Sequence, residues 1–341
     1  MRANFTKQSI KVNQTKNILE RIFNIKTKQN FIDTTFDIFN YQYNNNDIYK
    51  QYVQLIGCNP KNITHVSDIP FLPIEFFKQK KIISGQNHEK AIFLSSGTTG
   101  MVQSKHYVTD LDIYIESFIK SFNIFYGKPE NFIILALLPN YLEREGSSLV
   151  YMVNELINRS NSSHSGFYLH NYNELLNKIK GLKGSKKKLL LMGVSYALLD
   201  LPVVDPSVFE NIIIMETGGM KGKRKEMTKK ELHKALQEKF KVLNIHSEYG
   251  MTELLSQAYS QGKGVFETPP WMKVLIRDTY DPFDTLHSGR SGGINVIDLA
   301  NINSCSFIET KDIGKLYENN QFEVLGRFDN SDIRGCNLLI G

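Results

Sequence analysis

Four continuous apolar runs, separated by segments with helical spacing, constrain the fold of this chain more than any other feature. The runs occupy residues 131–139, 188–194, 211–219 and 241–246. Uninterrupted apolar strands of this length are typical of parallel sheets that are covered on both faces. The helical segments between them supply the crossovers that parallel strands need. The sequence therefore predicts an α/β fold with layered sheets.

Start signals for the intervening helices support this alternation. Ser147 or Ser148 is placed to cap one helix, and Asn173 is placed to cap the next. Thr228 and Glu231 have the spacing of a capping box. These signals lie between the apolar runs, where crossover helices are expected.

Two further regions flank the α/β pattern. Apolar residues within 1–84 recur at helical spacing and predict a helical N-terminal region packed on the main body, although Pro70 and Pro73 indicate an extended crossing segment. From about residue 264 the pattern changes to short β runs with turns, which predicts a smaller, mostly antiparallel lobe. We therefore expect a main domain over 85–341 that ends in this β lobe.

Composition narrows the class of protein. The chain has 341 residues, of which 41% are hydrophobic and 22% charged, as in soluble globular proteins. No stretch approaches the ~20 apolar residues of a membrane span, and the N-terminus lacks the apolar core of a secretion signal. We therefore expect a cytoplasmic protein with no membrane span. Three irregularly spaced cysteines argue against a disulfide framework.

Two basic clusters lie at 177–188 and 221–234, in a chain whose formal net charge is +6. They lack the interleaved aromatic residues of a nucleic-acid platform, so we expect no nucleic-acid partner. Such runs are usually solvated surface, with attraction of an anionic ligand or acidic partner as the alternative.

A loop rich in glycine and hydroxyl side chains follows a β-type run. Its residues are Ser95, Ser96, Gly97, Thr98, Thr99 and Gly100. Glycines let the backbone approach a ligand, and hydroxyl groups add hydrogen-bond donors without bulk, so the loop suits phosphate. The spacing fits neither the Walker motif nor the dinucleotide fingerprint. An ordinary Ser/Thr/Gly turn is the alternative reading.

The third and fourth apolar runs lead into polar, glycine-bearing segments. The third ends in Glu216, Thr217, Gly218 and Gly219, and the fourth leads into residues 246–253, HSEYGMTE. Ligands of parallel sheets collect at the carboxyl ends of strands, so both exits are candidate site segments.

A serine hydrolase is the main rival on these residues alone. Ser195, within GVSYA, is one residue short of the nucleophile-elbow pattern, and Asp205 and His246 follow in the chain order of that class. The alternative is structural: Gly193 and Ser195 are small residues at a place where two backbone segments pass closely, and they take no part in catalysis.

Five motifs in a fixed order resemble those of the adenylate-forming superfamily of acyl and aryl ligases. They are SSGTTG (95–100), TGG (217–219), YGMTE (249–253), ETKDIG (309–314) and LGRFDNSDIRG (325–335). From about residue 68 onward the chain is similar to LuxE-type acyl-protein synthetases. This closer resemblance is carried by PFLPIEFFKQKKI, the SKH after the loop, LPNYLEREGSSLVYMV, TGGMKGKR and RGCNLLIG.

The resemblance implies activation of a fatty acid by ATP and Mg²⁺, followed by transfer to an acyl-acceptor protein such as an acyl reductase. It implies that the hydroxyl groups of the 95–100 loop, with the backbone NH groups of Gly97 and Gly100, cradle phosphate, and that Lys105 adds charge. Glu253 is the implied Mg²⁺ carboxylate, and Thr252 the partner of the α-phosphate.

The same resemblance implies a set of residues around the nucleoside. Tyr249 is the expected flat face for adenine, where Gly218 and Gly219 permit close approach. Asp312 is implied to bind the ribose hydroxyls, and Arg327 to meet phosphate or ribose. Thr217 and Gly250 belong to the same motifs and are also expected to bind the nucleotide.

One departure from the superfamily concerns its small C-terminal domain, which contributes a lysine. The chain ends at Gly341, so we expect the main body without that domain, with Lys105 and Arg334 as candidate replacements for the lysine. The resemblance to acyl-protein synthetases implies that Cys336 accepts the acyl group, with Arg334 lowering the pKa of its thiol. The alternatives are an acyl- or aryl-CoA ligase, a hydrolase-like acyltransferase that uses Ser195, and a non-catalytic nucleotide-binding scaffold.

Overall fold

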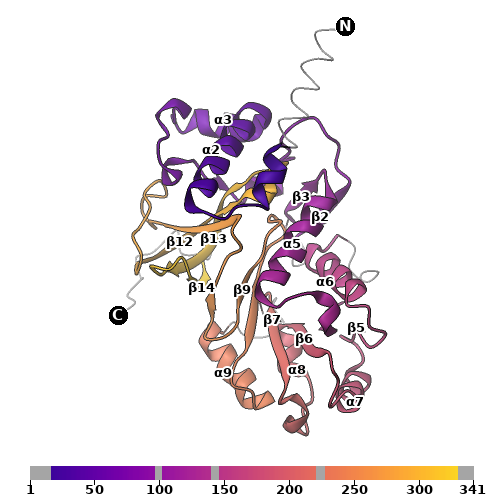
Figure 1. Ribbon diagram of the computed structural model, residues 1–341. Helices are drawn as coiled ribbons and strands as arrows, with labels where there is room; N and C mark the ends of the chain where they lie inside the picture. The colour runs from indigo at the N-terminus through magenta and orange to yellow at the C-terminus, as the bar shows by residue number, and fades with distance from the viewer. Residues whose placement is uncertain (1–16, 97–101, 140–145, 220–226, 329–341) are drawn as a thin grey trace.

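The computed structural model describes residues 17–96, 102–139, 146–219 and 227–328. Two sheets organise this part of the chain. A mainly parallel sheet with its helices forms the lower half of the molecule, and an antiparallel sheet lies above it beneath the N-terminal helices (Figure 1).

The lower sheet has the strand order β5-β4-β6-β7-β8-β9. Its strands are β4 (Phe132–Leu137), β5 (Gly166–Phe167), β6 (Lys188–Val194), β7 (Ile212–Thr217), β8 (His246–Tyr249) and β9 (Ala258–Ser260). All neighbours are parallel except β9, which runs antiparallel to β8. Side chains of β4 are buried throughout, as the continuous apolar run predicts. The predicted α/β class is confirmed.

The predicted position of the fourth strand, 241–246, is wrong, because the strand β8 spans His246–Tyr249. Helix α9 (Lys229–Phe240) ends at Lys241, which has a left-handed backbone with φ of 54°, and Leu243 is 90% exposed. This segment therefore connects the helix to the sheet. His246 begins β8, so it lies at the amino end of that strand and not at a strand exit. The exit is Tyr249 and Gly250.

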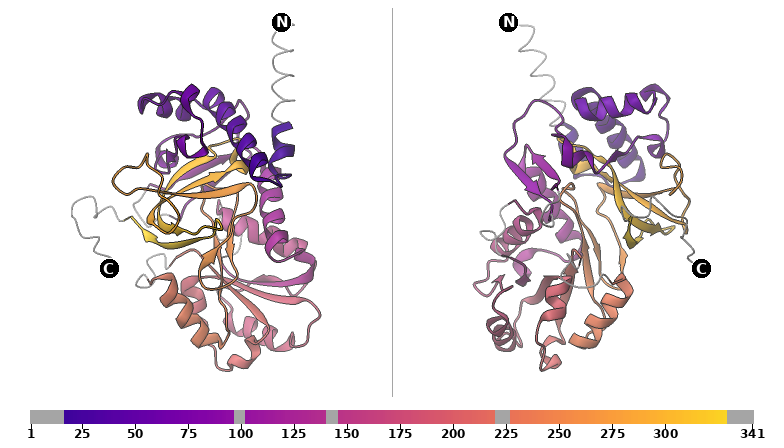
Figure 2. Two further views of the ribbon diagram at one scale, coloured as in Figure 1. Left: turned by 60° about the vertical axis from the view of Figure 1, so that its left-hand side comes forward. Right: turned by 180° about the vertical axis from the view of Figure 1, so that it is seen from behind.

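Helices cover both faces of the lower sheet (Figure 2). They are α5 (Leu111–Phe125), α6 (Ser148–Arg159), α7 (Tyr172–Gly181), α8 (Ser195–Asp200) and α9. Ser147 caps α6, and Thr228 with Glu231 forms the predicted capping box of α9. The prediction that Asn173 caps α7 is wrong, because the side chain of Asn171 accepts the hydrogen bond from the Glu174 amide.

The upper sheet has the order β10-β14-β13-β12-β11, and neighbouring strands in this order pair antiparallel. Its strands are β10 (Val265–Phe266), β11 (Met272–Arg277), β12 (Ser291–Asp298), β13 (Phe307–Leu316) and β14 (Phe322–Arg327). The strand β1 (Leu72–Pro73) joins β13 in parallel, so the segment between the two prolines is extended.

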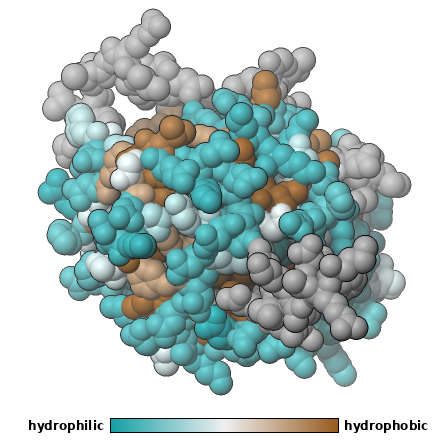
Figure 3. Space-filling view, turned by 90° about the horizontal axis from the view of Figure 1, so that it is seen from above, coloured by the Kyte–Doolittle hydropathy of each residue, from teal (hydrophilic) through white to brown (hydrophobic). Residues whose placement is uncertain are grey.

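The N-terminal helices pack on this upper sheet. They are α2 (Lys28–Asn45), α3 (Asp47–Leu55) and α4 (Phe76–Gln79), with short 3-10 turns η1 (Pro60–Asn62) and η2 (Val66–Asp68) between them. Phe39 of α2 packs edge-on against Phe307, and the buried Gln42 donates to the carbonyl oxygens of Asn301 and Ile302. The face above them is mainly hydrophilic, with small apolar patches (Figure 3).

The remaining elements are a short hairpin and three 3-10 turns. A hairpin of β2 (Ala91–Leu94) and β3 (Lys105–Val108) carries the loop predicted to bind phosphate. The 3-10 turns η3 (Pro129–Asn131) and η4 (Pro206–Phe209) precede β4 and β7, and η5 (Leu299–Asn301) follows β12. Among the described residues, no helix is both long and apolar enough to cross a membrane.

Candidate functional site

Hydrogen bonds of the β2–β3 hairpin join Ser95, the first residue of the predicted phosphate loop, to Ser104 beyond its end. The Ser95 amide donates to the Ser104 carbonyl at 3.1 Å, and the Ser104 amide donates to Ser95 Oγ at 2.9 Å. Gln103 Nε2 also donates to the Ser95 carbonyl, at 2.8 Å. Ser96 is exposed at the base of the loop. The other predicted loop residues, Gly97, Thr98, Thr99 and Gly100, lie outside the described residues.

Glu253 lies beside this hairpin. Its side chain is buried and forms a hydrogen bond with the side chain of Ser104. Burial raises the pKa of the Glu253 carboxyl, and the hydrogen bond with Ser104, followed by the charge of Arg327, partly opposes that rise. Thr252, the preceding residue, is half-buried, and its carbonyl oxygen lies 2.8 Å from Nδ1 of His106.

A second group joins the two sheets next to Glu253. Tyr249, at the carboxyl end of β8, donates from its hydroxyl to Asp312 Oδ2 at 2.8 Å. Arg327 Nε lies 3.2 Å from Asp312 Oδ1, and the Arg327 side chain is 70% exposed. The charges of Asp312 and Arg327 both act on the pKa of Glu253. The structure thus brings Tyr249, Glu253, Asp312 and Arg327 into one cluster.

Tyr249 offers little surface for a stacked base in this arrangement. The residue is only 8% exposed, and its ring packs edge-on against Phe266 and Phe322. Burial, followed by the charge of Asp312, raises the pKa of the Tyr249 hydroxyl well above its ordinary value, so this group is a donor at neutral pH. Stacking of adenine on this ring stays a prediction, whereas its hydrogen bond to Asp312 is a finding.

The predicted glycines serve two backbone requirements. Gly218 has φ of 63°, a conformation that L side chains rarely adopt, and both Gly218 and Gly219 are exposed at the end of β7. A Cβ at Gly250 would stand 2.5 Å from Oε1 of Glu248. Thr217 is buried between these segments and donates to Glu248 Oε2. Its hydroxyl is therefore engaged within the protein.

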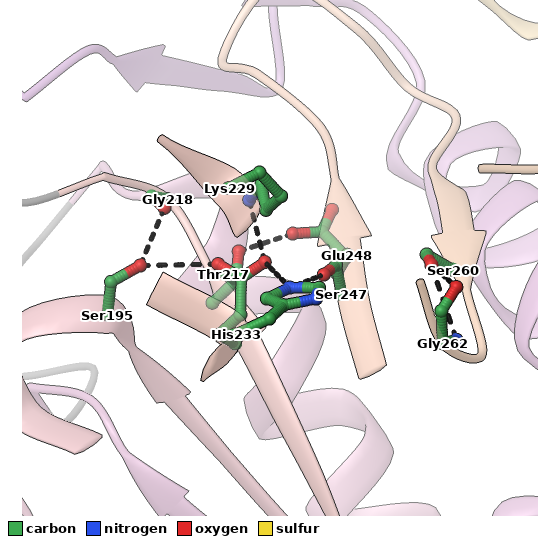
Figure 4. Close-up of polar contacts among 10 residues, drawn as sticks. Ser195, Thr217, Gly218, Lys229, His233, Ser247, Glu248, Ser260 and Gly262 are labelled. Carbon is green, nitrogen blue, oxygen red and sulfur yellow. Dashed lines mark hydrogen bonds and ion pairs between the residues drawn. The ribbon is translucent and has the colours of Figure 1, made fainter. Parts of the chain in front are cut away.

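A buried polar cluster supports the Thr217–Gly219 turn from the other face of the sheet (Figure 4). Glu216 is fully buried, and its Oε1 lies 2.6 Å from Lys229 Nζ and 3.4 Å from His233 Nε2. The positive charge of Lys229 is the main effect that overcomes burial and lowers the pKa of Glu216 to about 2. Ser195 Oγ is hydrogen-bonded to Gly218 O at 3.0 Å and lies 3.2 Å from Glu216 Oε2.

These contacts do not form a hydrolase triad. Ser195 is fully buried and its described partners are Glu216 and Gly218. Asp205 caps η4 through the Ser207 amide, and His246 Nδ1 lies 3.1 Å from the Tyr126 hydroxyl. A nucleophilic serine needs a base within hydrogen-bond reach, and neither residue is such a partner of Ser195.

Some predicted residues do not join the cluster. Lys105 is exposed on β3, whereas its neighbours Ser104 and His106 are buried and face Glu253 and Thr252. Since neighbouring strand residues point to opposite faces, Lys105 points away from Glu253. Cys336 and Arg334 lie outside the described residues.

The donor set fits a magnesium ion that is shared with phosphate. Within the described ranges, no group of three or more His, Cys, Asp or Glu side chains could hold a metal. Mg²⁺ typically uses one or two carboxylates together with waters and phosphate oxygens, so Glu253 alone is compatible with it. Ser104 and Asn301 also belong to the surroundings of Glu253. The sequence motifs include Ser104 in SKH without predicting a role for it, and none of them includes Asn301.

A hollow of about 470 Å³ lies at the opposite end of the lower sheet, near the start of β4. It is lined by residues 161–164 and 181–187, which include part of the first basic cluster. It contains none of the predicted site residues, so the chemistry points to the β8–β13 junction and not to this hollow.

The fold is that of the main body of adenylate-forming enzymes. One similar structure is ATP-bound MatB from Rhodopseudomonas palustris, with a TM-score of 0.52 and 18% identity over 70% of this chain and 48% of that one. Another is an open conformation of 2-hydroxyisobutyryl-CoA ligase in complex with 2-HIB-AMP and CoA, with a TM-score of 0.63 and 11% identity over 92% and 70% of the two chains. The chain spans about half the length of the MatB structure.

The sequence comparisons point to one branch of this class. The family model described as "Acyl-protein synthetase, LuxE" matches residues 21–127. The long-chain-fatty-acid–luciferin-component ligase of Vibrio harveyi is 24% identical over 338 residues, covering 88% of this chain and 84% of that protein. Both matches confirm the resemblance to LuxE-type acyl-protein synthetases and support the prediction of an AMP-forming acid–thiol ligase.

Proposed function

We propose that this protein uses ATP and Mg²⁺ to activate a fatty acid as its acyl-adenylate, and that the acyl group passes to Cys336 and then to an acceptor protein. The observation that carries the proposal is the cluster of Glu253, Asp312, Arg327 and Tyr249 at the base of the Ser/Thr/Gly loop. It combines a carboxylate suited to Mg²⁺, a second carboxylate and an exposed guanidinium group, which suit the metal, ribose and phosphate groups of a nucleoside triphosphate.

In the first step, a carboxylate oxygen of the fatty acid attacks the α-phosphorus of ATP. An O–P bond forms, and the bond to pyrophosphate breaks. Cations and N–H donors must stabilise the phosphate charge in the transition state. Glu253 would hold Mg²⁺ against the phosphates, and the exposed Arg327 would meet phosphate or ribose. Asp312 has one described partner on each oxygen, which leaves acceptor capacity for the ribose hydroxyls.

In the second step, the Cys336 thiolate attacks the acyl carbon. A C–S bond forms, the C–O bond to AMP breaks, and AMP leaves. Burial raises the pKa of Cys305 to about 12, and burial also raises the pKa of Cys58. Both are therefore poor thiolates at neutral pH, which favours Cys336 among the three cysteines.

The substrate and acceptor are proposed from the curated relative. That Vibrio harveyi protein is named as a ligase of long-chain fatty acids and a luciferin component. We extend the fatty acid to this chain, together with an acceptor protein such as an acyl reductase.

Intact-protein mass spectrometry tests the proposal. The wild type is incubated with ATP, Mg²⁺ and carboxylic acids from acetate to long-chain fatty acids, beside Cys336→Ser and the matched control Cys58→Ser. We expect a hydroxylamine-labile acyl adduct on the wild type and Cys58→Ser only, largest with a long-chain acid. Pyrophosphate without an adduct would leave adenylation standing and indicate an external acceptor such as coenzyme A. Absence of both products with every acid would contradict the proposal.

A further inference from the structure

Two buried side chains hold the backbone that carries Thr252 and Glu253. His106 comes from β3, directly after the phosphate loop, and Asn301 comes from η5 at the end of β12. Both side chains are fully buried. Neither belongs to the set of residues expected to touch nucleotide or metal.

The contacts define a continuous link. His106 Nδ1 lies 2.8 Å from the Thr252 carbonyl oxygen, and Asn301 Nδ2 donates to the Glu253 carbonyl oxygen at 2.8 Å. His106 Nε2 lies 3.1 Å from Asn301 Oδ1. Two consecutive carbonyl groups are therefore held by two side chains that also contact each other.

The chemistry of the ring assigns its proton. Both neighbours of the ring, the Thr252 carbonyl oxygen and Asn301 Oδ1, only accept hydrogen bonds, so the neutral imidazole donates to one of them. The shorter contact places the proton on Nδ1, toward Thr252, and the approach of Nε2 to Asn301 Oδ1 is then a packing contact without a hydrogen bond. Phe77 packs edge-on against the ring, with centroids 5.7 Å apart, and helps to fix its orientation. The ring is thus held rigidly against the turn.

We propose that His106 and Asn301 are positioning residues that hold the backbone of Thr252 and Glu253 against Ser104, a described residue that follows the phosphate loop. This inference rests on the proposed function. Ser104 directly precedes β3 and is two residues from His106, and both side chains are buried. The segment that follows the loop therefore contacts both the Glu253 side chain and the Thr252 backbone. Rigid coupling of this kind orients a metal-binding carboxylate before its ligand arrives.

Four single variants and the double variant His106→Leu/Asn301→Asp test the link. His106→Leu removes both ring contacts, whereas His106→Asn keeps an amide donor close to the position of Nδ1. Asn301→Asp keeps the size of the side chain but places an acceptor against the Glu253 carbonyl. Gln42→Leu is the matched control, because Gln42 is buried and donates to the Asn301 and Ile302 carbonyls without contacting Thr252 or Glu253 in any described hydrogen bond.

Two measurements are made on the full-length chain. Calorimetric titration gives the affinity for Mg²⁺-ATP without acid, and pyrophosphate release gives the half-saturating Mg²⁺, ATP and fatty acid concentrations. For His106→Leu and Asn301→Asp we expect the half-saturating concentrations of Mg²⁺ and ATP to rise roughly tenfold or more, because groups that orient a metal ligand are lost. The half-saturating concentration of the fatty acid should not change. His106→Asn should recover most of the affinity. The double variant should bind Mg²⁺-ATP no more weakly than the single variant with the lower affinity.

Three results decide the outcome. Half-saturating Mg²⁺ and ATP concentrations equal to those of the wild type in His106→Leu would overturn the inference, whatever the melting temperature of the variant. An equal loss in Gln42→Leu would also overturn it, because general loosening would then explain the effect. If the wild type binds Mg²⁺-ATP but releases no pyrophosphate, the proposed activity is refuted, and the binding titrations still test the positioning role of His106 and Asn301. If the wild type binds no Mg²⁺-ATP, both the proposed activity and the positioning role are refuted.

Discussion

The Tyr249 hydroxyl donates a 2.8 Å hydrogen bond to Asp312, and this contact ties the carboxyl end of β8 to β13 in the other sheet. The two residues are 63 positions apart in the chain. Both are buried, and Arg327 from β14 completes the group on the solvent side. The junction between the two sheets is thus also the place where the candidate nucleotide groups meet.

Tyr249→Phe should destabilise the protein and weaken ATP binding. The variant keeps the ring but removes a hydrogen bond to a charged, buried carboxylate, which is worth about 1.5–3 kcal/mol. Urea denaturation measures the loss in the free energy of unfolding, and nucleotide titration measures the affinity. Tyr114→Phe is the control, since the buried Tyr114 hydroxyl donates to the Ser148 carbonyl away from the cluster. An equal loss of ATP affinity in both variants would argue against a role of this junction.

Glu253→Gln should abolish the Mg²⁺ dependence of pyrophosphate release together with most of the activity. In the wild type, burial raises the pKa of Glu253, so protonation begins closer to neutral pH than for an ordinary glutamate. A carboxylate must lose its proton before it binds a metal, so the half-saturating Mg²⁺ concentration should rise as the pH falls from about 7.5 to about 5.5. A flat profile in the wild type would contradict the assignment of Glu253 as the metal carboxylate.

His106 should make stability fall in mild acid. Burial lowers the pKa of His106 to about 4, below the ordinary value of 6.5. The unfolded chain therefore binds a proton between these values and the folded protein does not, so this residue costs up to about 3 kcal/mol of stability as the pH falls from 6.5 to 4.

Comparison with His106→Asn isolates this contribution. The pKa of His246 is also lowered to about 4 by burial, whereas burial raises the pKa of Asp298 to about 6, which acts in the opposite direction. Thermal unfolding from pH 7 to pH 4.5 should show a smaller loss of stability in the variant than in the wild type. Parallel curves would mean that His106 is not buried as a neutral ring.

Ser195→Ala should keep adenylation and acyl transfer within about threefold of the wild type, because Ser195 supports the turn at Gly218 and attacks no substrate. Loss of its hydrogen bonds should lower the free energy of unfolding by about 1 kcal/mol. Pyrophosphate release, acyl-adduct mass spectrometry and urea denaturation measure these quantities. Complete loss of acyl transfer at unchanged stability would revive the hydrolase-like alternative.

Local signals in the sequence were enough for the α/β class, for three of the six strands of the lower sheet and for two helix caps. Apolar continuity and capping chemistry act within a few residues, so they are visible without the fold. The run at 241–246 misled because its apolar residues follow a helix end, and Leu243 faces solvent. Asn173 misled because Asn171 competes for the same cap, and spacing alone does not choose between them.

The motifs by themselves determined which residue types a nucleotide site would need, and their order along the chain indicated the class of enzyme. Only the tertiary structure decided which of them meet. In the folded chain Glu253 contacts Ser104, and Tyr249 contacts Asp312. Lys105 points away from Glu253, Ser195 is buried beside Glu216, and Asn301 contacts the Glu253 backbone. The physical reason is that strand pairing and side-chain alternation are short-range, whereas contact between two sheets depends on how their buried faces pack across long separations in sequence.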